Sequence, residues 1–181
     1  PAFFKRRRYM NQYWIIAAIV LPFLGAAAIP LLPFRSRRSM QWYIEGIVLL
    51  TSAIVGGILL GGKTEVFHVV HFVQNLSISF KIDGMSMVFA GLVALLWPLA
   101  TLYAFEYMEH EHHEKAFFMF YTMTFGVTLG IAFASDMVTM YFFYELLTLV
   151  TVPLVMHTMT REAILAVRKY LYYSIGADVV L

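Results

Sequence analysis

Long apolar runs separated by short polar segments dominate this chain. A helix needs about 20 apolar residues to cross a hydrocarbon layer of about 30 Å, and five of the runs are long enough. The runs are too long and too evenly apolar for the short alternating strands of a membrane barrel. The pattern therefore predicts an all-α, multi-pass membrane protein with five transmembrane helices and the start of a sixth. The predicted helices are residues 13–34, 40–62, 85–108, 116–134, 137–157 and 163 onward.

The segment between the second and third predicted helices has a different pattern. Residues 66–73 and 76–83 contain β-branched and aromatic residues in partial alternation, and Gln74 and Asn75 separate them. This pattern predicts a short β-hairpin on the membrane surface. The predicted organisation is a basic amino-terminal tail at 1–12, two helices at 13–62, a surface hairpin at 63–83 and four helices at 84–181. The last helix is still apolar at its final residue, so we expect the chain to continue.

The composition excludes several classes of protein. Hydrophobic residues make up 61% of the 181 positions and charged residues 13%, which is too apolar for a water-soluble domain of this length. The net charge of +2 is small and the basic residues stand at the ends of apolar segments, so they indicate membrane topology and give no support to nucleic-acid binding. They divide almost evenly between alternate loops and leave the orientation open. The absence of cysteine excludes disulfides and cysteine-ligated iron–sulfur clusters in this chain, in which we expect no cofactor.

The most informative charge is Glu145, in the predicted helix 137–157. At about 1.5 Å per residue it lies roughly 13 Å from Asp136, near the centre of the hydrocarbon layer. An acidic residue at that depth costs about 2.5–3.5 kcal/mol, and such residues usually mark proton or ion pathways. The alternative is a carboxylate that only ties two helices together. Residues with hydroxyl groups share its side of the helix, placed to hydrogen-bond the carboxylate or hold water beside it: Tyr141, Tyr144, Thr148 and Thr151.

Other polar positions receive a structural interpretation. Glu45 lies in the first turns of the predicted helix 40–62, so we expect it at the membrane interface. His68 and His71, in the hairpin, are interpreted as surface contacts. Small residues permit close packing of helices, and the helix 40–62 has five of them: Gly46, Gly56, Gly57, Gly61 and Gly62.

Residues 109–115 alternate glutamate with histidine and end in Lys115. These side chains are suited to a divalent metal or to proton collection at the surface. We favour a solvated loop, because no regular element is predicted there to orient the ligands.

Four short motifs, in consistent order, resemble the antiporter-like subunits shared by complex I, multi-subunit cation/proton antiporters and group 4 membrane-bound hydrogenases. They are residues 83–86 (Asp-Gly-Met-Ser), 144–147 (Tyr-Glu-Leu-Leu), 152–154 (Val-Pro-Leu) and 168–174 (Arg-Lys-Tyr-Leu-Tyr-Tyr-Ser). The resemblance implies the opening third of a fourteen-helix fold with two inverted five-helix repeats. It also implies a subunit of a larger complex in the inner cell membrane, with iron–sulfur clusters or other redox centres in partner subunits.

The resemblance also implies roles for individual residues. Glu145 would be the carboxylate that pairs with a lysine of a seventh helix, which these 181 residues do not include. Such a pair switches proton affinity when the ammonium moves toward or away from the carboxylate. Lys169 aligns with a family lysine, although near a helix end it also fits a side chain that reaches the interface. Asp178 aligns with an acidic residue of some members, and Ile175 stands where some members have arginine.

The function expected on these grounds is proton or sodium translocation in a redox-driven respiratory or hydrogenase-type complex. The alternatives are a structural membrane subunit and one half of a split transporter, in which Glu145 only anchors helices. Whether the complex is an enzyme depends on its partner subunits, since no redox chemistry is expected in this chain.

Overall fold

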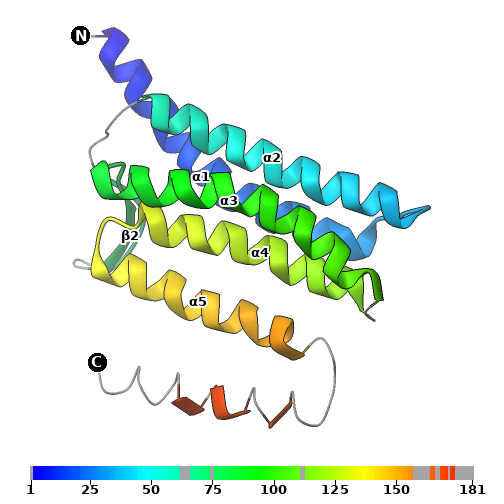
Figure 1. Ribbon diagram of the computed structural model, residues 1–181. Coiled ribbons are helices and arrows are strands. Elements are labelled where there is room, and N and C mark those ends of the chain that lie inside the picture. Colours follow the sequence, from blue (N-terminus) through cyan, green and yellow to red (C-terminus); the bar gives the residue numbers. More distant parts are fainter. Residues whose placement is uncertain are drawn as a thin grey trace.

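The computed structural model describes residues 2–61, 66–73, 76–110, 113–156, 164–165, 168–170 and 172–173. Within these residues it confirms a helical membrane protein with one small antiparallel hairpin (Figure 1). Five helices have an apolar stretch long enough to cross a bilayer. The elements are α1 (Ala2–Leu31), α2 (Arg37–Gly61), β1 (Phe67–Val73), β2 (Leu76–Phe80), α3 (Gly84–Tyr107), the short 3-10 helix η1 (Met108–His110), α4 (Glu114–Phe133) and α5 (Met137–Val155).

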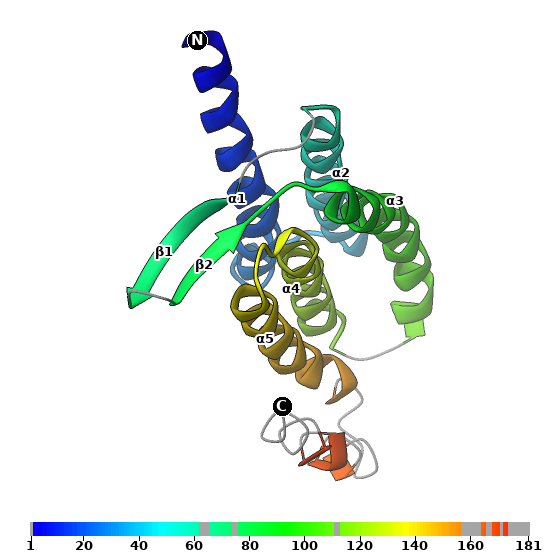
Figure 2. The ribbon, with the colours of Figure 1, turned by 90° about the vertical axis from the view of Figure 1, so that its left-hand side faces the viewer.

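The helices lie side by side, and α4 is at the centre of the group. It packs against α1, α3 and α5, while α2 packs mainly against α1 and α3. Figure 2 shows this arrangement, with the hairpin lying across one end of the bundle. The chain enters and leaves the hairpin from that end, so the turns between α1 and α2 and between α3 and α4 lie at the opposite end (Figure 1).

Two glycines of α4 lie where neighbouring helices approach closely. A Cβ atom on Gly126 would lie 2.7 Å from the carbonyl oxygen of Ile19 on α1, and one on Gly130 would overlap the ring of Phe143 on α5. The expectation that glycines of α2 serve this purpose is wrong for Gly46, Gly56 and Gly57, because a Cβ atom there would meet nothing within 4 Å. A spacing of small residues therefore shows where another helix could pack closely, but not whether a helix does so.

The Asp-Gly-Met-Ser motif begins α3 with a capping box. The Asp83 carboxylate accepts hydrogen bonds from the backbone N–H groups of Met85 (3.0 Å) and Ser86 (2.9 Å), and the Ser86 hydroxyl oxygen accepts one from the Asp83 N–H (2.7 Å). These bonds satisfy amide donors that have no partner within the helix. From this cap α3 continues through Pro98 to Tyr107.

The hairpin is fixed to the turn between α4 and α5. The Lys81 N–H donates to the carbonyl oxygen of Phe133 (2.9 Å), and the Ser135 N–H donates to the carbonyl oxygen of Ser79 (3.0 Å). Within the hairpin the strands are antiparallel, and Phe67 pairs with Phe80. Because β2 is held by backbone bonds at both of these points, the hairpin is part of the bundle end on which α5 begins.

An ion-pair cluster around Arg37 joins three elements at the opposite end. Its guanidinium group lies 2.9 Å from the Glu114 carboxylate and 3.5 Å from that of Glu109, and it donates to the carbonyl oxygen of Phe105 (2.8 Å). Residues 109–115 were expected to form a solvated loop, but two of their glutamates hold the start of α4 and η1 against the start of α2. The last carbonyl groups of a helix have no N–H partner within it. Because a guanidinium group can donate to several acceptors at once, Arg37 supplies a donor to one of these carbonyl groups at the end of α3.

Candidate functional site

Glu145 lies near the middle of α5, eight residues after Met137, or about 12 Å along the helix axis. The cap that sets this position is Asp136, whose carboxylate accepts a hydrogen bond from the Thr139 N–H (2.7 Å). The Glu145 side chain is half-buried, and its Oε1 atom is shielded from the surface. The position of Glu145 along the helix is therefore as predicted, and its depth in the bilayer stays a prediction.

Two faces of α5 have different surroundings. Phe143 and Val150 are buried in the main apolar core, where the Phe143 ring contacts that of Phe80 with centroids 5.7 Å apart. Tyr141 and Tyr144 are exposed, at 45% and 51%. The half-buried Glu145 thus lies at the border between the packed face of the helix and the face that the described residues leave exposed.

The threonine hydroxyls on this side are already engaged with the backbone. Thr148 donates to the carbonyl oxygen of Tyr144 (3.3 Å), and Thr151 donates to that of Thr148 (3.0 Å). A hydroxyl has one hydrogen to donate, so in this arrangement neither threonine donates to the Glu145 carboxylate. Their oxygen lone pairs can still accept hydrogen bonds from water. The other predicted role of these hydroxyl groups, which is to hold water beside the carboxylate, therefore stays a prediction.

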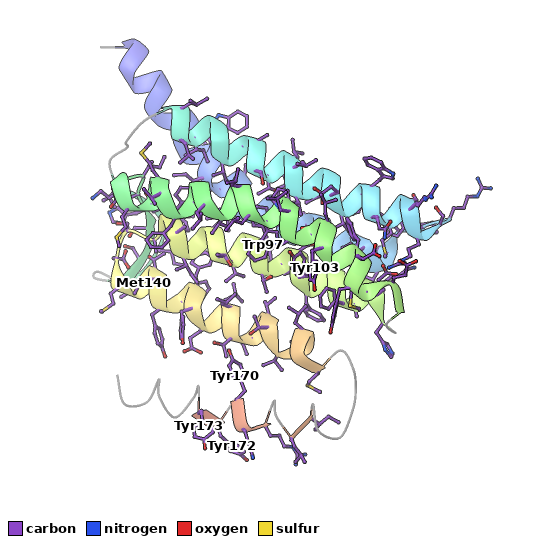
Figure 3. All side chains as sticks on the ribbon, viewed as in Figure 1. Trp97, Tyr103, Met140, Tyr170, Tyr172 and Tyr173 are labelled. Carbon is purple, nitrogen blue, oxygen red and sulfur yellow. The ribbon has the colours of Figure 1, made fainter. Side chains whose placement is uncertain are left out.

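The two weaker candidates lie beyond α5. Lys169 is in a described helical segment and is exposed, which fits a side chain reaching toward water or headgroups. Figure 3 labels its neighbours Tyr170, Tyr172 and Tyr173 on this segment, on the α5 side of the bundle. Asp178 and Ile175 lie outside the described residues, so the predictions for them stay predictions.

Glu45 is buried, which the sequence did not indicate. It is only 8% exposed. Because α2 begins at Arg37, three residues before the predicted start, Glu45 is more than two turns from the start of the helix. Its expected place at the membrane interface stays a prediction.

The histidine-rich positions give no metal site in the described part of the chain. No group of three or more His, Cys, Asp or Glu side chains with suitable geometry occurs there. His68 contacts the hydroxyl group of Ser77 across the hairpin (3.0 Å), which agrees with its interpretation as a surface contact. His113 has a left-handed backbone conformation (φ 67°) at the start of α4, and residues 111 and 112 lie outside the described residues.

Comparison with known proteins finds similar membrane subunits. Residues 71–118 match the family model described as NADH-Ubiquinone oxidoreductase (complex I), chain 5 N-terminus. These residues include the capping motif of α3 but not Glu145. The chain is 29% identical over 153 residues to an Na(+)/H(+) antiporter subunit of Alkalihalophilus pseudofirmus, and 28% identical over 176 residues to the chloroplastic NAD(P)H-quinone oxidoreductase chain 4 of Chara vulgaris.

This chain is a relative of the antiporter-like membrane subunits. The alignments cover 80% and 91% of the chain but only 19% and 35% of those two relatives. A chain of the membrane-bound sulfane sulfur reductase, an archaeal respiratory membrane complex of solved structure, has the same fold over 91% of this chain and 34% of its own length. Its TM-score is 0.76 at 21% sequence identity, so this likeness concerns the antiporter-like fold alone.

Proposed function

We propose that this chain belongs to a subunit that translocates protons or sodium ions across the membrane, and that Glu145 is its titratable group inside the bilayer. The observation that carries the proposal is a half-buried carboxylate near the middle of α5, an otherwise uncharged helix of membrane length. Such a group is costly unless it exchanges a proton or pairs with a cation, and that exchange is the elementary step of ion transport.

The site on α5 fits a partner from outside the described bundle. One side of the helix is packed against α4 and β2, and the other is exposed around Tyr141 and Tyr144. A cation approaching along the exposed face would reach the Glu145 carboxylate without displacing the core. The family resemblance implies a lysine of a seventh helix in this place, and movement of its ammonium group would change the proton affinity of both members of the pair.

The relatives support membership of a larger membrane complex. Their names describe subunits of an Na(+)/H(+) antiporter and of NAD(P)H-quinone oxidoreductase. Other membrane subunits are therefore the partners that we propose, and any iron–sulfur clusters or other redox centres would be held by them. This assignment fits a chain with no cysteine.

The decisive experiment replaces Glu145 in the complete complex and measures ion transport in sealed vesicles. Glu145→Gln keeps the size of the side chain and can still form hydrogen bonds, but it cannot exchange a proton. We expect an assembled complex with transport lost. Glu145→Asp keeps the titratable group and should retain a measurable part of the activity.

The same pair of variants tests the structural alternative. If Glu145 only anchors helices, Glu145→Gln will assemble and transport normally, because an amide still hydrogen-bonds. Normal transport by this variant would overturn the proposal. Repeating the assay with and without sodium, in the presence of an uncoupler, would identify the ion that moves.

A further inference from the structure

A second carboxylate, Glu45 of α2, lies inside the membrane-spanning part of the protein and is independent of α5. It is 8% exposed, and its Oε2 atom is shielded from the surface without a hydrogen-bond partner among the described residues. For this oxygen of a charged carboxylate the condition is unfavourable, since the atom has lost water and gained no donor. The position therefore requires a proton, a water molecule or a cation to complete it.

The side chain lines an open cavity between α2 and α3, in whose wall Trp42 is 77% and Leu102 54% exposed. The cavity measures about 340 Å³ and is lined by Arg38, Gln41, Trp42, Glu45, Leu102 and Phe105. This volume is sufficient for several water molecules, each of which takes about 30 Å³ in the liquid. Gln41 is one turn from Glu45 on the same face of α2, so its amide group can hydrogen-bond water held beside the carboxylate.

The cavity continues toward the Arg37 end of the bundle. A neighbouring cavity of about 430 Å³ shares Arg38, Gln41, Leu102 and Phe105 with the first, and adds Arg37 and two glutamates, Glu106 and Glu109. Glu45 is eight residues from Arg37, or about 12 Å along the helix axis. The two cavities thus form one groove that leads from the charged end of α2 to the buried carboxylate.

The groups around the groove favour a proton over a metal cation. Hard cations take several oxygen ligands. Among the side chains that line the cavity beside Glu45, only Glu45 itself and Gln41 have oxygen atoms. The Arg38 guanidinium in the same lining would repel a second cation. A proton needs only the carboxylate oxygen and a chain of water molecules.

The charged and titratable groups near Glu45 come from several of the elements packed around it. On α2 the charged neighbours are Arg37 and Arg38, and on α3 and η1 they are Glu106 and Glu109. On α4, Tyr121 lies within electrostatic range of Glu45, and Glu114 is occupied by Arg37. The stretch of α1 from residue 14 to 31 has no titratable side chain. Among the described residues, the carboxylate thus has basic neighbours only toward the Arg37 end.

We propose that Glu45 is a second protonatable site, which exchanges its proton with water at the Arg37 end through the groove between α2 and α3. In this step a carboxylate oxygen takes up or releases one proton, and water in the groove gives or receives it. The site is entered from the end opposite to the hairpin, whereas Glu145 lies about 12 Å from the hairpin end of α5. The inference goes beyond the proposed function and does not require Glu145 to be the transport site.

The first test is infrared difference spectroscopy of the complete complex on a change of pH. We expect the carbonyl stretch of a protonated carboxyl group to disappear as the pH rises, to be lost in Glu45→Gln, and to persist in the matched variant Glu145→Gln. Should Glu45→Gln fail to assemble, Glu45→Asp must shift the signal in frequency. A spectrum that neither Glu45 variant changes would overturn the proposal, whatever the transport activity of the Glu145 variants.

The second test follows the route of access. These 181 residues contain no cysteine, so a single substitution adds one thiol to this part of the protein. Gln41→Cys, in the groove, should react with a membrane-impermeant thiol reagent added on the Arg37 side, with loss of reaction when the reagent is on the other side. Leu49→Cys, on the exposed apolar surface of α2, is the control and should not react. A Gln41→Cys variant that is as unreactive as Leu49→Cys would show that water does not enter the groove and would overturn the proposed route.

Discussion

The backbone N–H of Ser79 donates a hydrogen bond of 2.9 Å to the hydroxyl oxygen of Thr139, across 60 residues of sequence. Ser79 belongs to the second strand of the hairpin and Thr139 to the first turn of α5, which carries Glu145 nearly two turns further on. Both residues are almost fully buried, so neither group can turn to water instead. This bond connects the hairpin to the start of the helix that bears the candidate site.

Thr139→Val tests this connection. Valine has nearly the same shape but no acceptor, so the buried N–H of Ser79 loses its partner, and we expect a loss of about 1–3 kcal/mol in the free energy of unfolding. Thermal unfolding of the purified complex in detergent measures the effect. Thr128→Val is the matched control, because among the described residues the Thr128 hydroxyl donates only to a carbonyl group of its own helix. Equal effects of the two substitutions would contradict the assigned role of Thr139.

Asp136 makes this same junction sensitive to acid. Desolvation raises the pKa of its carboxyl group, but hydrogen bonds from the Ser79 and Thr139 side chains and from the backbone of α5 together outweigh it, and the net pKa is lowered. A lowered folded-state pKa stabilises the protein above the unfolded value of about 3.9, and this stabilisation is lost as the pH falls through the folded-state pKa. Asp136→Asn should therefore reduce stability at neutral pH and flatten its decline below about pH 4. Unfolding curves measured across that range check the prediction, and an unchanged acid slope would refute it.

Gly126 is predicted to be the least replaceable glycine of the bundle. Gly126→Ala would place a Cβ atom 2.7 Å from the carbonyl oxygen of Ile19, and because that atom is backbone, α1 and α4 would have to separate. We expect a loss of about 1–3 kcal/mol, as for other overpacked contacts. Gly57→Ala meets open space and should stabilise α2 by up to about 1 kcal/mol through helix propensity. Thermal unfolding of the two variants should shift in opposite directions, and a shift in the same direction would show that the α1–α4 contact does not limit stability.

Hydropathy alone predicted the helices because the free energy of transferring a segment to a bilayer is a property of that segment. The boundaries moved by only a few residues for α3, α4 and α5, and the Asp-Gly-Met-Ser motif marked a helix start where a capping box is observed. The position of Glu145 along α5 followed from the same count along one helix. The hairpin was predicted by its partial alternation, although nothing in its own residues indicated that it would be held by Phe133 and Ser135.

The sequence by itself determined which segments enter the membrane and how far along α5 Glu145 lies. Both depend on the composition of one continuous helix and on its rise per residue. Only the tertiary structure decided that Glu45 is buried beside a cavity, that Arg37 pairs with Glu114, and that Gly126 lies against the backbone of α1. Each of these relationships joins residues on different elements. Helices that are apolar on all sides do not reveal in their sequence which face meets which neighbour, so the packing of the bundle had to supply that choice.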